Sequence, residues 1–179
     1  MPRPVSPRIW LSENAFVSMV SASVEAFKDE TFGVLLGLRE PERKRFMVQY
    51  AVVYQTAERT RREVHPDLKR AKRLNEFLKN VTYLDVIGYF HSHPEMPVEK
   101  LASCQLSNSD KRSISVGDVE VVIAIDEDRK ERDWHHLSKG SLLGSVFPYS
   151  LKMSAWFNTE NDGFKLSKIH CPFALGLGR

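Results

Sequence analysis

Two stretches of the chain place apolar residues at steps of three and four, the spacing that gathers side chains on one face of a helix. In the first stretch, Phe16, Met19 and Val20 follow Ser12, whose hydroxyl can cap the first turn. The second stretch begins after Pro66, a favourable first residue of a helix, and has Leu or Ala at positions 68, 71, 74 and 78. Both patterns predict an amphipathic helix with one face on the core.

Six other runs are short, apolar and rich in β-branched and aromatic residues, which is typical of buried strands. The last two flank Asn161-Asp162-Gly163, a sequence that favours a tight turn between paired strands. Because these runs alternate with the helical patterns, the predicted fold class is α/β or α+β. The predicted strands cover residues 32–38, 46–54, 83–90, 119–125, 151–157 and 164–169.

Length and composition fit one domain over residues 1–179. The 26 basic and 23 acidic residues nearly balance, so we expect no dedicated nucleic-acid or membrane binder. Two cysteines, Cys104 and Cys171, are too few for a disulfide framework or a Cys-rich zinc motif. The N-terminal segment lacks the apolar stretch of a signal peptide, and no apolar run is long enough for a membrane span. We therefore expect a cytoplasmic protein.

Positive charge is nevertheless concentrated in residues 59–73, where seven Lys or Arg stand against Glu63 and Asp67. The simplest interpretation is a solvated helix face. A docking surface for an acidic partner, or less plausibly for nucleic acid, is the alternative. Steep salt dependence of binding to DNA or RNA would support the nucleic-acid interpretation.

His91 and His93 are the first residues with the potential for metal chemistry. On an extended strand, residues i and i+2 point to the same face, so both imidazoles can reach one ion. Pro94 then ends the strand. A His-x-His pattern is weak by itself, because it also arises by chance.

The segment Ser107-Asn108-Ser109-Asp110 has two compatible interpretations. It can be a helix start in which Ser107 is the cap and Asp110 occupies the third position, near the positive helix end. The same rigid start can present Asp110 as a third metal ligand. Two His and one Asp leave one tetrahedral position of Zn²⁺ open, as a catalytic site requires.

Glu30 immediately precedes an apolar strand pattern. It can be an exposed charge at the edge of the strand. It can also be a carboxylate that takes a proton from water at the metal and passes it to a leaving amine.

Three motifs, in this order, resemble those of the JAMM/MPN-plus metalloproteases: ETFGVLLG at 30–37, GYFHSHP at 88–94 and SNSD at 107–110. The resemblance covers residues 30–126 and implies the MPN fold, a central mixed β-sheet flanked by helices with a core like that of cytidine deaminases. It implies one Zn²⁺ per chain, held by His91, His93 and Asp110. It also makes Glu30 the general acid/base and the Ser107 hydroxyl a donor to the oxyanion.

The spacing departs from the family pattern in one place. Thirteen residues, 94–106, separate His93 from Ser107, which is more than the family usually has. We expect the additional residues to bulge as a loop beside the active site. Cys104 in this loop is interpreted as a small, partly buried side chain; a sharper hypothesis lets its thiolate, or Glu95, occupy the open position of the zinc.

The resemblance implies an isopeptidase that cuts after the C-terminal Gly of ubiquitin or a ubiquitin-like protein. A Gly-Gly tail suits a narrow channel along a strand edge, which we expect residues 56–66 and 94–106 to form. Glu95 or Glu99 would meet an Arg of such a tail. The chain looks most similar to the proteasome-lid deubiquitinase type, as an archaeal or other prokaryotic relative acting alone or with a proteasome-like machine.

Two alternatives to the isopeptidase stay open. One is a hydrolase that releases cysteine or another amino acid from a sulfur-carrier protein, and the other is a non-catalytic MPN scaffold. The remaining histidines offer no competing site: His135 and His136 are adjacent and would face opposite sides of a strand. His65 is interpreted as a turn residue, and His170 lacks companion ligands.

Overall fold

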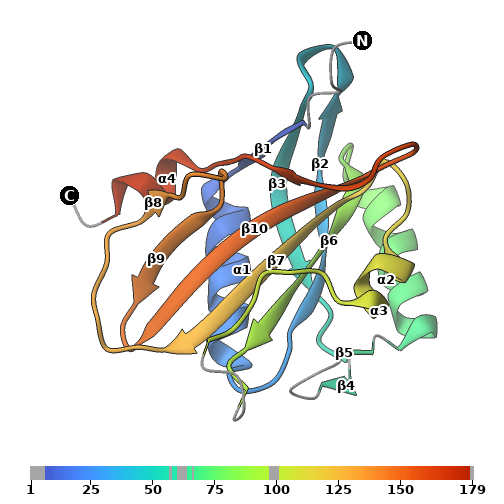
Figure 1. Cartoon of the computed structure of the whole chain (residues 1–179). Coiled ribbons are helices and arrows are strands. Elements are labelled where there is room, and N and C mark those ends of the chain that lie inside the picture. Colours follow the sequence, from blue (N-terminus) through green and yellow to red (C-terminus); the bar gives the residue numbers. More distant parts are fainter. Residues whose placement is uncertain (1–6, 57, 60–63, 66, 97–100, 178–179) are drawn as a thin grey trace.

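The computed structural model of the chain describes residues 7–56, 58–59, 64–65, 67–96 and 101–177 (Figure 1). The helices are α1 (Glu13–Glu25), α2 (Leu68–Val81), α3 (Asn108–Ser113) and α4 (Pro172–Gly176), with a 3₁₀ turn at Pro41–Arg43. The strands of the main sheet are β1 (Arg8–Leu11), β2 (Phe32–Glu40), β3 (Arg45–Val53), β6 (Asp85–Pro94), β7 (Val119–Glu127), β8 (His135–His136), β9 (Leu142–Val146), β10 (Tyr149–Thr159), β11 (Gly163–Ser167) and β12 (Ile169–His170). Two short strands, β4 (Glu58–Arg59) and β5 (Val64–His65), pair separately.

The sheet order is β12-β1-β3-β2-β6-β7-β10-β9-β8, and β11 pairs with β10 beside this path. The pairs β1–β12, β1–β3 and β6–β7 are parallel, and the other pairs are antiparallel. The predicted fold class, α/β or α+β with a central mixed sheet, is therefore confirmed.

One face of the sheet is covered by α1 (Figure 1). Its side chains Phe16, Met19 and Val20 join the largest apolar cluster, together with Ile87 and Phe90 of β6. The predicted cap is confirmed, because the Ser12 hydroxyl accepts a hydrogen bond from Ala15 N at 3.1 Å. This face supplies most of the core.

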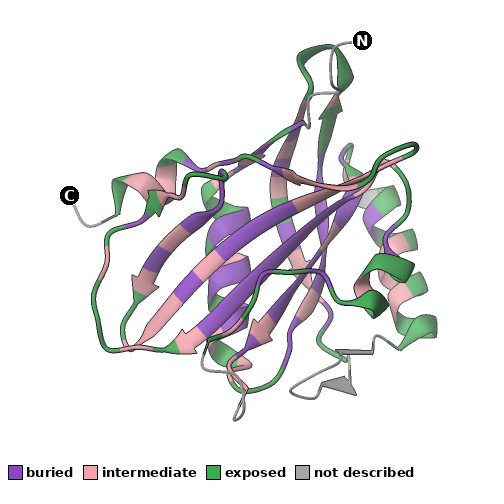
Figure 2. Cartoon of the chain, viewed as in Figure 1, coloured by how far each residue is buried: buried purple, intermediate pink, exposed green. Residues whose placement is uncertain are grey.

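The opposite face is covered in two separate places. Leu78 of α2 packs with Val34 and Leu36 of β2, and the segment that leads into α3 packs with Val122 and Ala124 of β7. Central strands are thus buried on both sides (Figure 2). This explains why their sequences are continuous apolar runs instead of alternating patterns.

The structure adds elements that the hydrophobic pattern missed. The short strands β1 and β9 and the helix α4 were not predicted, and the polar segment 126–140 contains β8 and the buried Trp134. The helix α2 begins at Leu68, and the Asp67 carboxylate caps it by accepting hydrogen bonds from Lys69 N and Arg70 N. Pro66, the predicted first residue of this helix, lies outside the described residues. The predicted turn at 161–163 does join paired strands, β10 and β11.

Gly88 of β6 lies directly opposite Val119 of the neighbouring strand β7. A β-carbon at this position would stand 1.8 Å from the Val119 carbonyl oxygen, so the strands would have to separate. We expect Gly88→Ala to lower the free energy of unfolding by about 3 kcal/mol or more, measured by urea denaturation. Gly176→Ala is the control, because its β-carbon would meet no atom within 4 Å. Equal stability of the two variants would contradict this prediction.

Candidate metal centre

The end of β6 presents two imidazoles on one face of the sheet. His91 and His93 are two residues apart on the strand, and their Nε2 atoms lie 3.0 Å from each other. Asp110 Oδ2 lies 3.6 Å from the His91 Nε2 and 3.8 Å from the His93 Nε2. Three potential ligand atoms from two distant segments therefore converge on one point.

Asp110 is held in place by the start of α3. Its backbone N donates to the Ser107 hydroxyl at 3.1 Å, and its Oδ2 accepts from Ser107 N at 2.6 Å, so the two residues form a capping box. The cap interpretation and the ligand interpretation of this segment thus hold together: the cap fixes the carboxylate that faces the histidines. The longer spacing between His93 and Ser107 does not displace Asp110 from the site.

The three side chains fit a divalent metal ion. Zinc binds His nitrogen and carboxylate oxygen at about 2.0–2.2 Å, which places tetrahedral ligand atoms about 3.3–3.6 Å apart. The observed separations of 3.0, 3.6 and 3.8 Å lie around this range. Two nitrogens and one oxygen form a donor set that zinc accepts. His91, His93 and Asp110 can therefore hold a metal ion.

Both histidines are held through their other ring nitrogen. The His93 Nδ1 lies 2.7 Å from the Ser103 carbonyl oxygen, which can only accept, so the Nδ1 carries the proton. The His91 Nδ1 lies 2.6 Å from Glu120 Oε1. These contacts turn both Nε2 lone pairs toward the proposed ion.

The segment after Pro94 packs beside the site in its described part, residues 101–106. Ala102 N donates to Asp126 Oδ1 at 2.6 Å, and Trp156 Nε1 donates to the Cys104 carbonyl oxygen at 2.9 Å. These two anchors flank Ser103, the residue whose carbonyl holds His93. Ser103 of this segment thus contributes to the site through its backbone carbonyl, whereas residues 97–100 of the predicted bulge lie outside the described residues.

Glu30 is buried, with 7% of its surface exposed, so the interpretation as an exposed charge is wrong. Its Oε1 lies 3.9 Å from the His93 Nε2. Thr31 N donates to the Ser92 hydroxyl at 2.9 Å, which ties the residue after Glu30 to the strand between the two histidines. The carboxylate is therefore buried beside the candidate ligands.

The environment of His91 changes its proton affinity. Burial alone would lower the pKa of His91, but hydrogen bonds with Asp110 and Glu120 outweigh it and raise the pKa to about 10. Burial would likewise raise the pKa of Asp110, but the hydrogen bond from His91 and its charge lower it well below its usual range. At neutral pH the metal-free site therefore holds a protonated His91 beside an ionised Asp110.

Metal binding is expected to strengthen as pH rises. Below its raised pKa, His91 carries a proton on the Nε2 that a metal ion must displace, so binding releases about one proton. The apparent association constant should rise about tenfold per unit between about pH 7 and pH 9. Competition titrations with a chromophoric chelator measure this slope, and a pH-independent constant would contradict the prediction.

Cys104 does not point toward the metal ligands. Its side chain is 4% exposed, and its Sγ donates to the Lys152 carbonyl oxygen at 3.0 Å. Burial raises the pKa of the Cys104 thiol, which opposes a thiolate. The ordinary buried side chain is confirmed and the hypothesis of a thiolate on the zinc is wrong.

Glu95 and Glu99 are the two acidic residues of this loop that were predicted to meet an Arg of the substrate tail. The Glu95 carboxylate accepts a hydrogen bond from Glu127 N at 3.0 Å and is not part of the ligand group. Glu99 lies outside the described residues.

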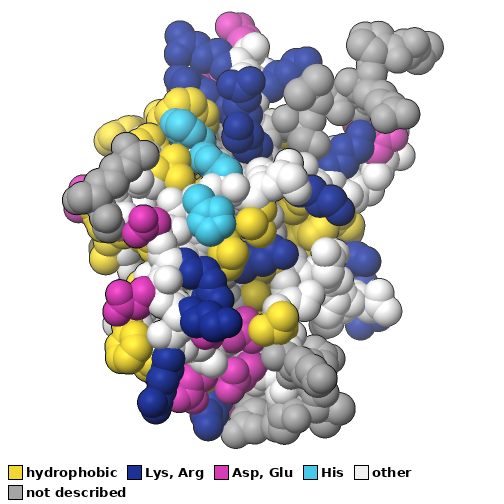
Figure 3. Space-filling model, turned by 60° about the vertical axis from the view of Figure 1, so that its left-hand side comes forward, with side chains coloured by type: hydrophobic (Ala, Val, Ile, Leu, Met, Phe, Trp, Pro, Cys, Tyr) yellow, Lys and Arg dark blue, Asp and Glu magenta, His cyan; other side chains and the backbone are white. Residues whose placement is uncertain are grey.

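Other histidines gather elsewhere. His136 and His170 stack with ring centroids 6.4 Å apart, and Figure 3 shows histidine side chains together on the side of the molecule that carries β8. His135 and His136 are adjacent on the strand β8, and the group of potential metal ligands found within the described part of the chain does not include them. The side chain of His65 is not described.

Glu120 is the residue of the site that the sequence motifs missed. It is 3% exposed and touches His91, yet it belongs to none of the three motifs. A signal was present: Glu120 is the single charge in VEVVIAI, an otherwise apolar strand. A buried charge of this kind requires a partner.

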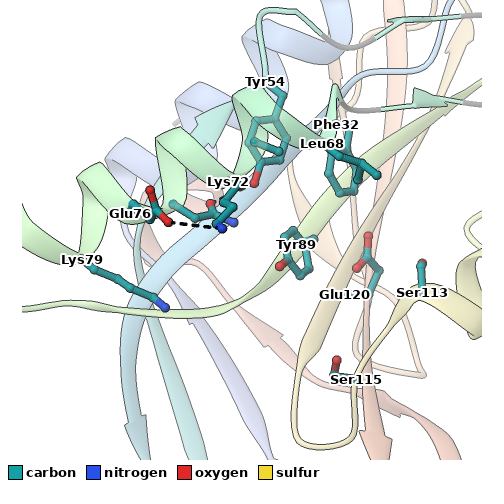
Figure 4. A pocket seen from close by; sticks show the side chains of 12 residues that line it. Phe32, Tyr54, Leu68, Lys72, Glu76, Lys79, Tyr89, Ser113, Ser115 and Glu120 are labelled. Atoms are coloured by element: carbon teal, nitrogen blue, oxygen red, sulfur yellow. Dashed lines mark hydrogen bonds and ion pairs between the residues drawn. The ribbon is translucent and has the colours of Figure 1, made fainter.

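A pocket of about 570 Å³ opens next to Glu120, between α2 and α3 (Figure 4). One wall is a row of rings in which Phe32 stacks on Tyr54 and on Tyr89, with centroids 5.4 and 5.6 Å apart. Lys72, Glu76 and Lys79 of α2 also line the pocket, and Lys72 pairs with Glu76 at 3.9 Å. The candidate ligand His91 is thus connected through Glu120 to a pocket lined by aromatic and charged side chains.

Comparison with known proteins agrees with this geometry. The family model described as JAB1/Mov34/MPN/PAD-1 ubiquitin protease matches residues 5–113, so the chain belongs to this family. The solution structure of protein DSY2949 from Desulfitobacterium hafniense is similar in fold, with a TM-score of 0.62 and 17% identity over 91% of this chain and 92% of that chain. No curated protein matches the chain. Within the described residues, no helix is long and apolar enough to cross a membrane.

Proposed function

We propose that the chain is a zinc-dependent isopeptidase that hydrolyses the amide bond after the C-terminal Gly of ubiquitin or a ubiquitin-like protein. The observation that carries this proposal is the convergence of His91, His93 and Asp110 at the end of β6, with the buried Glu30 carboxylate 3.9 Å from the His93 Nε2. Membership in a family described as ubiquitin protease supports the substrate class.

We assign the roles of the side chains from the family resemblance, and their positions support the assignment. His91, His93 and Asp110 would hold a zinc ion, which would supply Lewis acidity for the attacking water and the scissile carbonyl. Glu30 accepts a proton from the water and delivers it to the leaving amine, because it is buried beside the candidate ligands. The Ser107 hydroxyl, at the start of α3, donates to the carbonyl oxygen as negative charge develops there.

A polypeptide tail suits the surroundings of the site. An extended Gly-Gly segment lacks side chains and can add a strand to an exposed edge. The paired strands β4 and β5 lie in the segment 56–66, which we propose as one wall of the channel, and the pocket beside α2 offers a surface for the modifier itself. We also propose that the protein acts alone or together with a proteasome-like machine.

The test is cleavage of a ubiquitin-like fusion by the zinc-loaded protein, with zinc quantified in the same sample. A carrier–cysteine adduct, offered in parallel, distinguishes the isopeptidase from a hydrolase of sulfur-carrier adducts. We expect cleavage of the fusion, its loss after chelation and its return with zinc. Zinc binding without cleavage of either substrate would contradict the proposal and leave a metal-binding scaffold.

A further inference from the structure

Glu120 is buried in a strand, where a carboxylate is unfavourable unless it interacts with a partner. The other residues of its strand between 119 and 125 are apolar and no more than 1% exposed. The partner of the Glu120 carboxylate is His91, whose Nδ1 lies 2.6 Å from Oε1. A charge in such a place costs free energy unless a hydrogen-bonded partner compensates it.

We infer that Glu120 is a positioning residue that holds His91 with its Nδ1 protonated and its Nε2 turned toward the metal. The strand register explains the geometry. β6 and β7 are parallel, with Tyr89 opposite Glu120 and His91 opposite Val122, so Glu120 lies one strand over and two residues before the histidine on the same face. From there its carboxylate reaches the ring nitrogen that faces away from Asp110.

The two histidines are held by chemically different partners. A neutral backbone carbonyl holds His93, whereas a carboxylate holds His91. A negative partner increases the electron density of the imidazole and so strengthens it as a ligand. With Asp110, Glu120 also supplies a second negative charge close to a divalent cation. Replacing Glu120 should therefore lower the affinity for the metal without removing a ligand.

The pocket beside α2 supplies a matched control. Figure 4 shows Glu120 between Tyr89 and Ser113 on the pocket wall. Tyr89 lines the same cavity on the neighbouring strand, but its ring belongs to the aromatic row and not to the metal ligands. Tyr89→Phe thus alters the same hollow and leaves the contact between His91 and Glu120 in place.

The experiment measures zinc affinity and the state of the His91 ring in the full chain. Competition with a chromophoric chelator gives the zinc dissociation constant for the wild type, Glu120→Gln, Glu120→Ala and Tyr89→Phe. Long-range proton–nitrogen correlation spectra of the zinc-loaded proteins show which ring nitrogen of His91 is protonated. Neither readout requires hydrolysis, so the inference rests on the metal site and can fail separately from the proposed isopeptidase activity.

We expect Glu120→Ala to weaken zinc binding by about 10- to 100-fold and to broaden or shift the His91 Nδ1 signal. Glu120→Gln keeps an acceptor but loses the charge, so its affinity should fall between those of Glu120→Ala and the wild type, with the Nδ1 still protonated. Unchanged zinc affinity in both Glu120 variants would overturn the inference. An equal loss in Tyr89→Phe would also overturn it, because repacking of the pocket would then be the cause.

Discussion

Glu30→Gln is expected to lower kcat/KM for a ubiquitin-like fusion by at least about a hundredfold while the zinc content stays at one ion per chain. Gln has the shape of Glu but cannot take a proton from water at neutral pH. The Glu30 carboxylate lies 3.9 Å from the His93 Nε2, close enough to act on water at the metal. Steady-state kinetics and elemental analysis of the same preparation give the two values.

Asp29→Asn is the matched control for this prediction. It removes the same charge one residue earlier, at an exposed position, and should leave both zinc content and kcat/KM unchanged. If Glu30→Gln kept most of its activity, another group would have to move the proton. If zinc were lost together with activity, Glu30 would be a ligand and not the proton carrier.

The central strands were predictable because strands that are buried on both faces have continuous apolar sequences. The strands β6, β7 and β10 were recognised as short apolar runs at residues 83–90, 119–125 and 151–157. The short strand β1 has no such apolar run. It forms because its backbone pairs in parallel with β3 and β12. Such pairing joins residues far apart in sequence, and no local pattern encodes it.

The candidate site was predictable to the extent that its chemistry depends on side-chain type. Strand periodicity allowed His91 and His93 to face one ion, and the helix start allowed Asp110 to face it too, but only the resemblance to the JAMM/MPN-plus motifs joined them into one set of ligands. The carbonyl that holds His93 could not be predicted, because residue 103 of any type offers the same oxygen. The orientation of the Cys104 side chain could not be predicted either, because it depends on packing against β7 and on the hydrogen bond to the Lys152 carbonyl oxygen.

His93→Ala is expected to weaken zinc binding by at least about a hundredfold and to reduce cleavage of the fusion to background. His93 contributes one of the three ligand atoms, and the remaining His91 and Asp110 cannot hold a zinc ion with comparable affinity. His93 is also the safer ligand to remove, because His91 is more deeply buried and carries the contact with Glu120. The metal-free variant should therefore remain folded.

Thermal unfolding with and without zinc distinguishes a variant that no longer binds zinc from one that no longer folds. A ligand that binds only the native state raises the midpoint by mass action, so zinc should raise the midpoint of the wild type and leave that of His93→Ala unchanged. The exposed His135 gives the control: His135→Ala removes the same side chain from β8, outside the ligand group, and should keep both the zinc-dependent rise and the cleavage. A zinc-dependent rise of wild-type size in His93→Ala would place the metal elsewhere, and the hydrolytic role of this site would have to be abandoned.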